Sequence, residues 1–528
     1  MEKNRNEKNG ERVYRACSEI VRWSLMILMG VLILLVLFLQ NVESYASLRI
    51  FPAENIILAL IGGIVTTGLL KVKAIQEKRN KSEKYSKHVR ILCIFSALLF
   101  ILQLIISWNI YFKTGWDANM VMTAAEQVAS GKTENLNNVY FSRYPNNVML
   151  VWVFSKLLQL GAVIPGVVQE NLWMVVIGFQ CLLLTISGMF LFGSIHRLTD
   201  STWYSWFGWG IFVLLQGTSA WMVIPYSDSM GVIFPIAGFY LYLRCREGRR
   251  AKLLWFVIGI LAYFAYKIKP QAFLIFLAIF LWSFFELLCR WKEYWKTGIK
   301  TMFCVVAALA VSVGGFKVMI AQTGFQLDQE QTVGMAHFIM MGLNEQTKGK
   351  YAEEDVQFSI SFDHTSIRNE EDLNEALSRV KDMGLAGLLQ HEARKALVNF
   401  ADGSFAWGDE GNFYNVIYEE KNDNLSPLLR SMYYQDGKLY RLQYWVRQVC
   451  WLTVMLLILG NSLRKNQKAE MTVLMVGLIG LILFVQIFEA RARYLYTMVP
   501  LFIICAAVGM QSYVKAIANV GKSRRKTF

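Results

Sequence analysis

The strongest constraint on this chain is a succession of hydrophobic stretches, each about 20 residues long and almost free of charge. A hydrocarbon core of about 30 Å requires about 20 apolar residues in a helix, so each stretch is suited to crossing a bilayer. The sequence therefore predicts an all-α polytopic membrane protein. The thirteen stretches are 23–40, 55–71, 91–111, 147–163, 172–194, 202–219, 226–244, 252–267, 270–288, 301–321, 441–460, 470–487 and 494–512.

Short basic loops predict which side of the membrane each end of a stretch faces, because cytoplasmic loops are rich in Lys and Arg. Thirteen crossings would place the two basic termini on opposite sides. We therefore expect about twelve crossings, with 147–163 and 202–219 as candidates for the stretch that does not cross. The predicted location is the cell membrane, with cytoplasmic termini and no cleavable signal peptide. The basic clusters are 71–90, 244–250, 290–300, 464–468 and 515–526.

The segment 322–440 differs in charge from the rest of the chain. It contains 20 Asp or Glu and 10 Lys or Arg, whereas the remaining residues carry a net charge of +25. We expect this segment to be extracellular and of mixed α/β structure, with a helix at 371–399 and a strand at 355–368. An acidic segment outside a basic membrane body excludes nucleic acid as a partner and leaves the lipid bilayer as an obligatory one.

Four regions follow from this arrangement. They are 1–90, an N-terminal tail with two accessory transmembrane helices; 91–321, a transmembrane core with a first external loop at 112–146; 322–440, the acidic external domain; and 441–528, C-terminal transmembrane helices with a basic cytoplasmic tail. All eight cysteines lie in or beside apolar stretches and none lies in 322–440. That pattern predicts neither a disulfide framework nor a zinc site.

The first external loop carries a carboxylate at the outer end of a predicted span. Asp117 precedes a stretch with helical apolar spacing, and Gly131 is placed to end that surface helix. Asp117 could cap this helix, as Asp commonly does. Alternatively, partial desolvation at the membrane boundary suits a carboxylate to act as a general base. Arg143 and Tyr144 follow before the next apolar stretch.

Three further external turns carry charges, and in the last two these are Lys and Arg residues that oppose the positive-inside bias. Asp228, two residues after Tyr226, opens an apolar helix and could cap it, and Lys269 interrupts a hydrophobic run. Lys269 could snorkel to the surface as a structural lysine. Arg491 and Arg493 lie in the last short external loop. Cations and carboxylates at one membrane level predict a site for an anionic lipid.

These residues resemble motifs of family 39 glycosyltransferases (protein mannosyltransferase and aminoarabinose transferase-like) of the GT-C superfamily. Asp117, followed by Ala124, Val128 and Gly131 and then by Arg-Tyr-Pro at 143–145, is similar to the first external loop of that family. The chain resembles a poorly characterised bacterial branch. The similarity covers about 110–275 and 485–505, roughly a third of the chain.

Later turns extend the resemblance. The Tyr-x-Asp at 226–228 resembles the family's Asp at the start of a later helix, and Lys269-Pro270 resembles its Thr-Lys-Gly-Pro turn without the glycine. Arg493-Tyr494 with Pro500 resembles its Arg-Tyr-x-x-Pro segment. Two features depart from the family: Asn146 and Asn147 stand where a second proline is usual, and 322–440 is unlike the β-trefoil insert of protein mannosyltransferases.

The resemblance implies an inverting transfer of a sugar from a polyprenyl-phosphate donor to an unknown cell-envelope acceptor. Asp117 would be the general base, and Lys269 and Arg493, with Arg491, would bind the lipid phosphate. The residues that could orient the acceptor or a divalent cation are Tyr226, Asp228, Arg143, Tyr144 and His337. The only cofactor that this interpretation allows is a divalent cation.

Other functions remain open at this stage. A transporter or lipid flippase could bind the same anionic lipid, but it would be expected to show internal repeats and charges near the midplane. A polysaccharide polymerase or ligase would also handle polyprenyl-linked glycans, using arginines and a histidine in a large external loop. An assembly partner with a decayed site is a third possibility.

Overall fold

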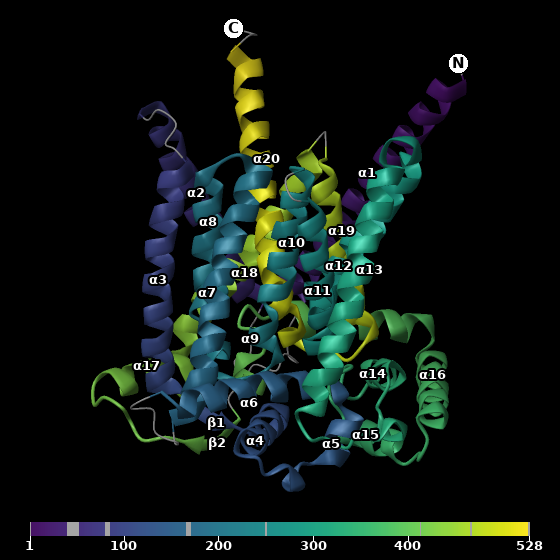
Figure 1. Ribbon diagram of the computed structural model, residues 1–528. Coiled ribbons are helices and arrows are strands. Elements are labelled where there is room, and N and C mark those ends of the chain that lie inside the picture. The colour runs from purple at the N-terminus through teal and green to yellow at the C-terminus, as the bar shows by residue number, and fades with distance from the viewer. Residues whose placement is uncertain are drawn as a thin grey trace.

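The computed structural model describes residues 2–39, 52–79, 85–164, 171–248, 251–411, 413–464 and 467–525. Parts of the predicted basic clusters, at 80–84, 249–250, 465–466 and 526, lie outside the described residues. The structure is mostly helical. A bundle of long helices stands on a layer of shorter helices, and α1 begins and α20 ends at the end of the bundle opposite that layer (Figure 1).

Ten helices of the described part are long and apolar enough to cross a membrane. Six of these precede the acidic segment and one leads into it, and three follow it. They are α1 (Glu2–Phe38), α2 (Pro52–Arg79), α3 (Tyr85–Ile110), α7 (Leu172–Thr199), α11 (Ala251–Ile268), α12 (Pro270–Cys289), α13 (Trp291–Ala321), α18 (Tyr440–Ile458), α19 (Ala469–Ile487) and α20 (Val499–Arg525). The prediction of a polytopic, mainly α-helical membrane protein is confirmed.

Three hydrophobic stretches form helices that are too short to count as candidate spans. α6 (Val148–Ala162) packs on α4 within the layer of shorter helices, whereas α8 (Thr202–Phe212) and α10 (Ile233–Arg246) stand in the bundle beside α7 (Figure 1). α8 continues into a π-helical turn at Val213–Gly217, and α9 (Ser227–Gly231) precedes α10. Twelve crossings would require both α8 and α10 to span, so that number stays a prediction.

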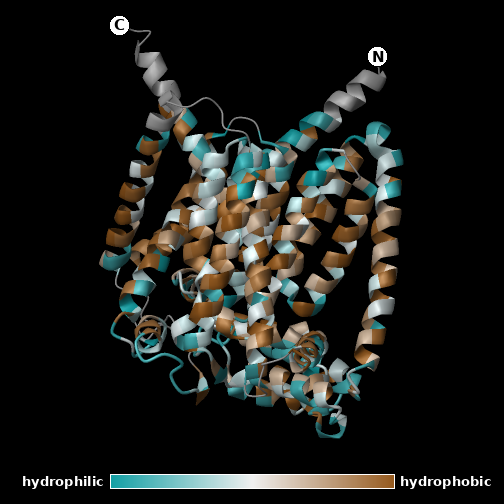
Figure 2. Cartoon of the chain, turned by 60° about the vertical axis from the view of Figure 1, so that its left-hand side comes forward, coloured by the Kyte–Doolittle hydropathy of each residue, from teal (hydrophilic) through white to brown (hydrophobic). Residues whose placement is uncertain are grey.

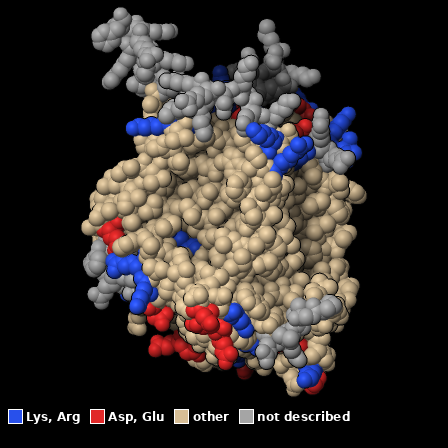
Figure 3. All heavy atoms as spheres, turned by 90° about the vertical axis from the view of Figure 1, so that its left-hand side faces the viewer, with Lys and Arg blue, Asp and Glu red and all other residues tan. Residues whose placement is uncertain are grey.

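The outer surface of the bundle has the composition of a lipid-facing surface. Hydrophobic residues cover its length between two hydrophilic ends (Figure 2). On the face drawn in Figure 3, a broad and almost uncharged band separates charged side chains near the two ends. Large apolar side chains of α13, such as Phe303 and Val311, are 73% and 60% exposed, which would be unfavourable in water and is suited to lipid.

The prediction of a mixed α/β external domain is wrong, because 322–440 is chiefly helical. Val356, Phe358 and Ile360 alternate as in a strand, but they lie in a helix whose buried residues include Val356 and Ser359, at helical spacing. The predicted helix at 371–399 lies within α16. The helices of the segment are α14 (Met335–Gly342), α15 (Glu353–Ile360), α16 (Thr365–Phe400) and α17 (Leu425–Tyr433).

The layer of shorter helices also includes 112–146, the loop that is predicted to be external. This loop forms α4 (Trp116–Ser130) and α5 (Asn138–Arg143), and α4 ends at Gly131 with a φ of 76°, as predicted. Strand β1 (Phe112–Thr114) pairs antiparallel with β2 (Tyr414–Ile417), with Phe112 opposite Ile417. The acidic segment is therefore joined to the first loop by backbone hydrogen bonds.

The sidedness of the two ends can be tested with introduced cysteines. Ser361 follows α15, and Lys468 precedes α19 at the other end; both are exposed. In intact cells, a membrane-impermeant thiol reagent should label Ser361→Cys and leave Lys468→Cys unlabelled until the cells are lysed. Labelling of position 468 alone would place the acidic segment inside the cell. The parent chain, with its native cysteines, gives the background signal.

Candidate functional site

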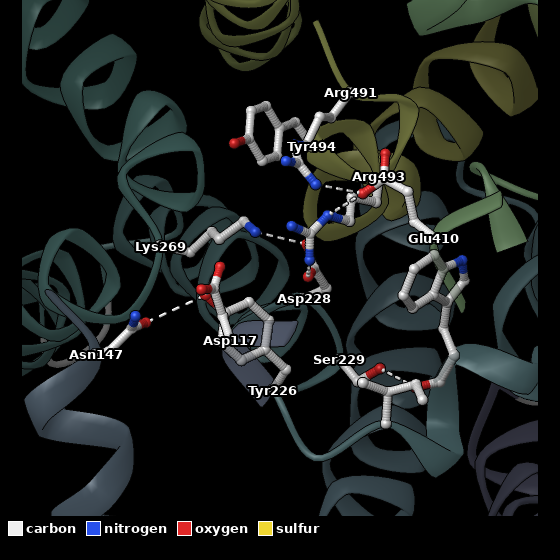
Figure 4. A network of polar contacts seen from close by, with 12 residues as sticks. Asp117, Asn147, Tyr226, Asp228, Ser229, Lys269, Glu410, Arg491, Arg493 and Tyr494 are labelled. Atoms are coloured by element: carbon white, nitrogen blue, oxygen red, sulfur yellow. Dashed lines mark hydrogen bonds and ion pairs between the residues drawn. The ribbon is translucent and has the colours of Figure 1, made fainter. Parts of the chain in front are cut away.

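Four separate segments meet where the bundle joins the layer of shorter helices. They are the start of α4, the turn before α9, the junction of α11 with α12, and the loop between α19 and α20. Figure 4 shows their polar side chains directed toward one another. The site contains a carboxylate at one edge and a buried network of charges beside it.

Asp117 lies in the first turn of α4 but does not cap the helix. Gly115 holds the N-cap position without a side-chain hydrogen bond, and Trp116 has a φ of 41°. Asp117 instead accepts a hydrogen bond of 2.8 Å from the hydroxyl of Tyr140, which in turn accepts one of 3.0 Å from the Asn147 amide. The capping interpretation of Asp117 is therefore wrong. Its half-buried side chain is available for another role.

A second phenol faces the same carboxylate. The Tyr226 hydroxyl lies 3.5 Å from Asp117 Oδ2 and 3.3 Å from Asn147 Oδ1. Burial, together with the charge of Asp117, raises the pKa of both Tyr140 and Tyr226. Both phenols therefore stay protonated and serve as donors that orient Asp117.

A buried side chain positions Tyr226. Gln180 in α7 donates to the carbonyls of Met222 and Ile224, at 3.0 and 2.8 Å, and its own oxygen accepts from Tyr226 N at 3.2 Å. One fully buried amide thus satisfies three backbone groups of the turn that would otherwise lack partners. This arrangement fixes the backbone that carries Tyr226 and Asp228.

Asp228 bridges two cations in the interior of the protein. Lys269 Nζ donates to Asp228 Oδ1 at 2.6 Å, and Arg493 donates to Oδ2 at 3.3 Å. Asp228, Lys269 and Arg493 are 2%, 6% and 4% exposed. Neither the capping role of Asp228 nor the snorkelling role of Lys269 is observed, because both side chains end in this buried contact. Buried charges are costly unless they are paired, and here each has a partner.

Two further carboxylates complete the charge network: Glu489 from the loop between α19 and α20, and Glu410 from the segment before β2. By the charge network we mean Asp228, Lys269, Glu410, Glu489, Arg491 and Arg493. Glu410 Oε2 lies 2.7 Å from Arg493 Nε and 2.8 Å from Arg491. Arg491 also donates to Glu489 at 2.7 Å, and Tyr494 donates to the same carboxylate at 2.6 Å. Three acids and three bases make the network formally neutral. Burial would raise the pKa of Glu489, but Arg491 and the bond from Tyr494 lower it.

A left-handed turn brings Glu410 to the site. Phe405 and Ala406 have φ values of 57° and 61°, in the region that non-glycine residues seldom adopt. Asp402 stabilises this turn by accepting hydrogen bonds from the backbone nitrogens of Ser404 and Ala406, at 2.6 and 2.7 Å. The chain then enters the π-helical turn Trp407–Gly411, which contains Glu410.

Aromatic rings line the network. The Arg493 guanidinium lies 4.5 Å from the ring of Trp116, and Lys269 Nζ lies 4.9 Å from that of Tyr494. Trp116 also packs edge-on against Tyr226, with 5.0 Å between ring centroids. Such faces attract cations and offset part of the cost of removing them from water. Aromatic rings beside polar groups are also suited to contact a sugar.

The remaining predicted residues lie at different distances from this centre. The Tyr144 ring packs at a tilt against that of Tyr140, with ring centroids 5.3 Å apart, and burial and the charge of Asp117 raise the pKa of Tyr144 to about 12. Arg143 is half-buried and next to it. His337 is not part of the network. It is buried in α14, where Nδ1 lies 2.6 Å from the Ser359 hydroxyl, and burial lowers its pKa.

A metal site was considered from the sequence. Among the residues that the structure describes, no three His, Cys, Asp or Glu side chains are grouped so that they could hold a metal ion. Asp228 forms ion pairs with two cations, Lys269 and Arg493, which is unlike the surroundings of a metal-binding carboxylate. The residues present do not fit a cation held by protein groups alone.

Sequence reasoning missed Glu410, Glu489, Tyr140 and Asn147 as site residues. The usable signal was charge balance, since three cations facing outward at one membrane level require carboxylates nearby. Asp409-Glu410 is one of several acidic pairs in the segment 322–440, so charge balance alone does not identify Glu410. Tyr140 precedes Arg143 and Tyr144 by one helical turn, which places it on the same side of α5.

Comparison with protein families gives one match. The family model described as "Conserved hypothetical integral membrane protein" matches residues 14–514. The chain belongs to this family. The description agrees with the membrane-spanning helices and names no activity. No match to this chain was found among curated proteins or among solved structures.

Asp228 should matter more for stability than Asp117 does. Asp228→Asn leaves Lys269 buried without its carboxylate, so we expect a loss of about 3–5 kcal/mol in the free energy of unfolding. Asp117→Asn keeps an oxygen that can accept from Tyr140 and only weakens the hydrogen bonds from the phenols at a half-buried position, so it should cost at most about 1 kcal/mol. Thermal unfolding of both purified variants in detergent measures the difference. Equal losses would contradict the assignment of Asp228 as the centre of the network.

Proposed function

We propose that this protein transfers a sugar from a polyprenyl-phosphate donor to an acceptor hydroxyl at the outer face of the cell membrane. Its termini would then be cytoplasmic and 322–440 extracellular, with α8 and α10 bringing the crossings to twelve. The observation that carries the proposal is the position of Tyr226. Its hydroxyl faces Asp117, and its ring lies 5.7 Å from both Lys269 Nζ and the Arg493 guanidinium.

The proposed reaction needs a base and a phosphate site on opposite sides of one sugar carbon. Asp117 takes the proton of the acceptor hydroxyl while that oxygen forms a bond to the anomeric carbon. The bond from this carbon to the phosphate oxygen breaks, and the phosphate leaves with the electron pair. Lys269, Arg491 and Arg493 stabilise the charge that develops on it. Tyr140 and Tyr226 hold Asp117 in position by hydrogen bonding.

The neutrality of the charge network adds a condition to this mechanism. Lys269 and Arg493 each already contact a carboxylate, so an arriving phosphate must replace or share one of these contacts. Arg491 has the most exposed side chain of the three cations, at 18%. We therefore propose that the phosphate first meets Arg491 and then competes with Asp228 for the two buried cations.

Asp117 is tested by a conservative replacement. Asp117→Asn keeps the shape and the hydrogen bond from Tyr140, but it cannot take a proton at neutral pH. Turnover should fall by about 10²–10⁴-fold while donor binding is retained. The assay is sugar transfer from labelled polyprenyl-phosphate sugars by purified protein in detergent. Glu126→Gln is the matched control, because Glu126 lies in the same helix and bonds to Trp173 instead.

Wild-type turnover in Asp117→Asn would refute the general-base assignment. If the parent protein binds the lipid in vesicles and moves it across the bilayer without transferring sugar, the flippase alternative is the correct one.

The phosphate site is tested with polyprenyl phosphate that carries no sugar, which separates binding from chemistry. Lys269→Ala and Arg491→Ala should each weaken its binding by about 1.5–3 kcal/mol, or roughly 10–150-fold. Lys267→Ala is the control, because Lys267 lies two residues away and contacts the ring of Phe316. Unchanged affinity in both site variants would contradict the proposal. Equal weakening in the control would indicate a nonspecific effect of external positive charge.

A further inference from the structure

Helix α16 changes direction at Gly384 and is divided there into two arms. Gly384 has a φ of 59° and a ψ of −176°, so the backbone leaves the helical conformation at this residue alone. The arm after the bend reaches under the bundle. There Lys395 donates to the carbonyl of Gln486 at 2.5 Å and Asn399 donates to that of Val485 at 2.9 Å.

These bonds fix the position of the second arm along the axis of the helix bundle. Val485 and Gln486 belong to the last turn of α19, a candidate span, so the arm lies where that span ends. Helix α16 also packs against α1, another candidate span. Figure 1 shows α16 at the margin of the molecule, with its bend on the side that faces the spanning helices. The bend is therefore next to the boundary between membrane and water.

The bend itself is apolar and exposed. Residues 383–389 read Met-Gly-Leu-Ala-Gly-Leu-Leu, without a single polar side chain. Leu385 and Leu389, four residues apart and thus on one face of the second arm, are 76% and 64% exposed. Leu377, on the first arm, is 67% exposed. In water this would be an unusual surface, because runs of exposed apolar residues promote association.

We infer that the bend at 383–389 inserts into the lipid leaflet beside the bundle and anchors α16 to the membrane surface. Lipid is the occupant that the position favours, because the second arm is already fixed at the end of two spans. The nearest Lys, Arg, Asp and Glu residues lie before and after the run and leave the run itself uncharged; they are Lys381, Asp382, Glu392 and Arg394. A second copy of the chain would require a complementary apolar surface projecting at the same level. This inference does not depend on the proposed sugar transfer.

The anchoring has a consequence for the site. The backbone of α16 continues from the second arm through Phe400 into the turn that presents Glu410. Lipid contact at one end of this arm and the bonds to α19 at the other would hold the arm at two points. The position of Glu410 relative to Arg491 and Arg493 then depends on the membrane as well as on protein contacts.

An environment-sensitive fluorophore tests the insertion. The variant Leu385→Cys is prepared in a Cys93→Ser background, because Cys93 is an exposed native cysteine. It is labelled with NBD in detergent and reconstituted into phosphatidylcholine vesicles with or without lipids that carry a doxyl quencher near the headgroup. Asn374→Cys is the matched control, since it is exposed on the other arm about 15 Å along the helix. We expect a blue-shifted emission and a loss of roughly half of the fluorescence with doxyl lipid at 385. For the label at position 374 we expect neither a blue shift nor quenching by doxyl lipid.

Two results would overturn the inference. Emission at 385 that matches that at 374 and is not quenched would place the bend in water. A blue shift that depends on protein density in the vesicles, without quenching by doxyl lipid, would show that the bend is covered by a second copy. Circular dichroism of both variants checks that α16 remains folded, so that an absence of quenching cannot be attributed to unfolding.

Discussion

The site depends on the pairing of buried charges. Asp228, Lys269 and Arg493 lie almost completely out of water, and an isolated charge at such a depth would cost several kcal/mol. Each therefore requires a partner of opposite sign, and the partners come from segments far apart in the chain. This requirement places the turn before α9 beside the junction of α11 and α12. It also brings the loop before α20 to the same point.

The same requirement explains why the acidic segment is not an independent unit on the membrane body. Glu410 comes from this segment and contacts two arginines of the loop between α19 and α20. The β1–β2 pair and the contacts of α16 with α19 join the segment to the body at two further places. Its net negative charge is thus partly used inside the site, where it balances cations, and is not only a solvated surface.

The sequence predicted the helices and the membrane class because long apolar stretches admit few other structures. The predicted sidedness of the turns also placed Asp117, Asp228, Lys269 and Arg493 at one end of the bundle. Sequence reasoning missed Glu410, because one carboxylate among twenty in a segment gives no sign of its partner. The prediction of a strand at 355–368 was wrong. Alternation of apolar and polar residues over so few positions also fits a short helix that buries Val356 and Ser359. The capping interpretation of Asp117 was wrong because Gly115 occupies the N-cap position of α4.

The order of the charged residues along the chain has a consequence for biosynthesis. Asp228 and Lys269 are only 41 residues apart, so their pair can form as soon as α11 is inserted. Glu410 is synthesised next, and Arg491 and Arg493 follow about 80 residues later. Between these events the growing cluster has one carboxylate in excess. Because burial of an unpaired carboxylate is costly, we expect Glu410 to remain in water until the loop before α20 supplies these arginines. Formation of the buried centre therefore depends on the loop that carries Arg491 and Arg493.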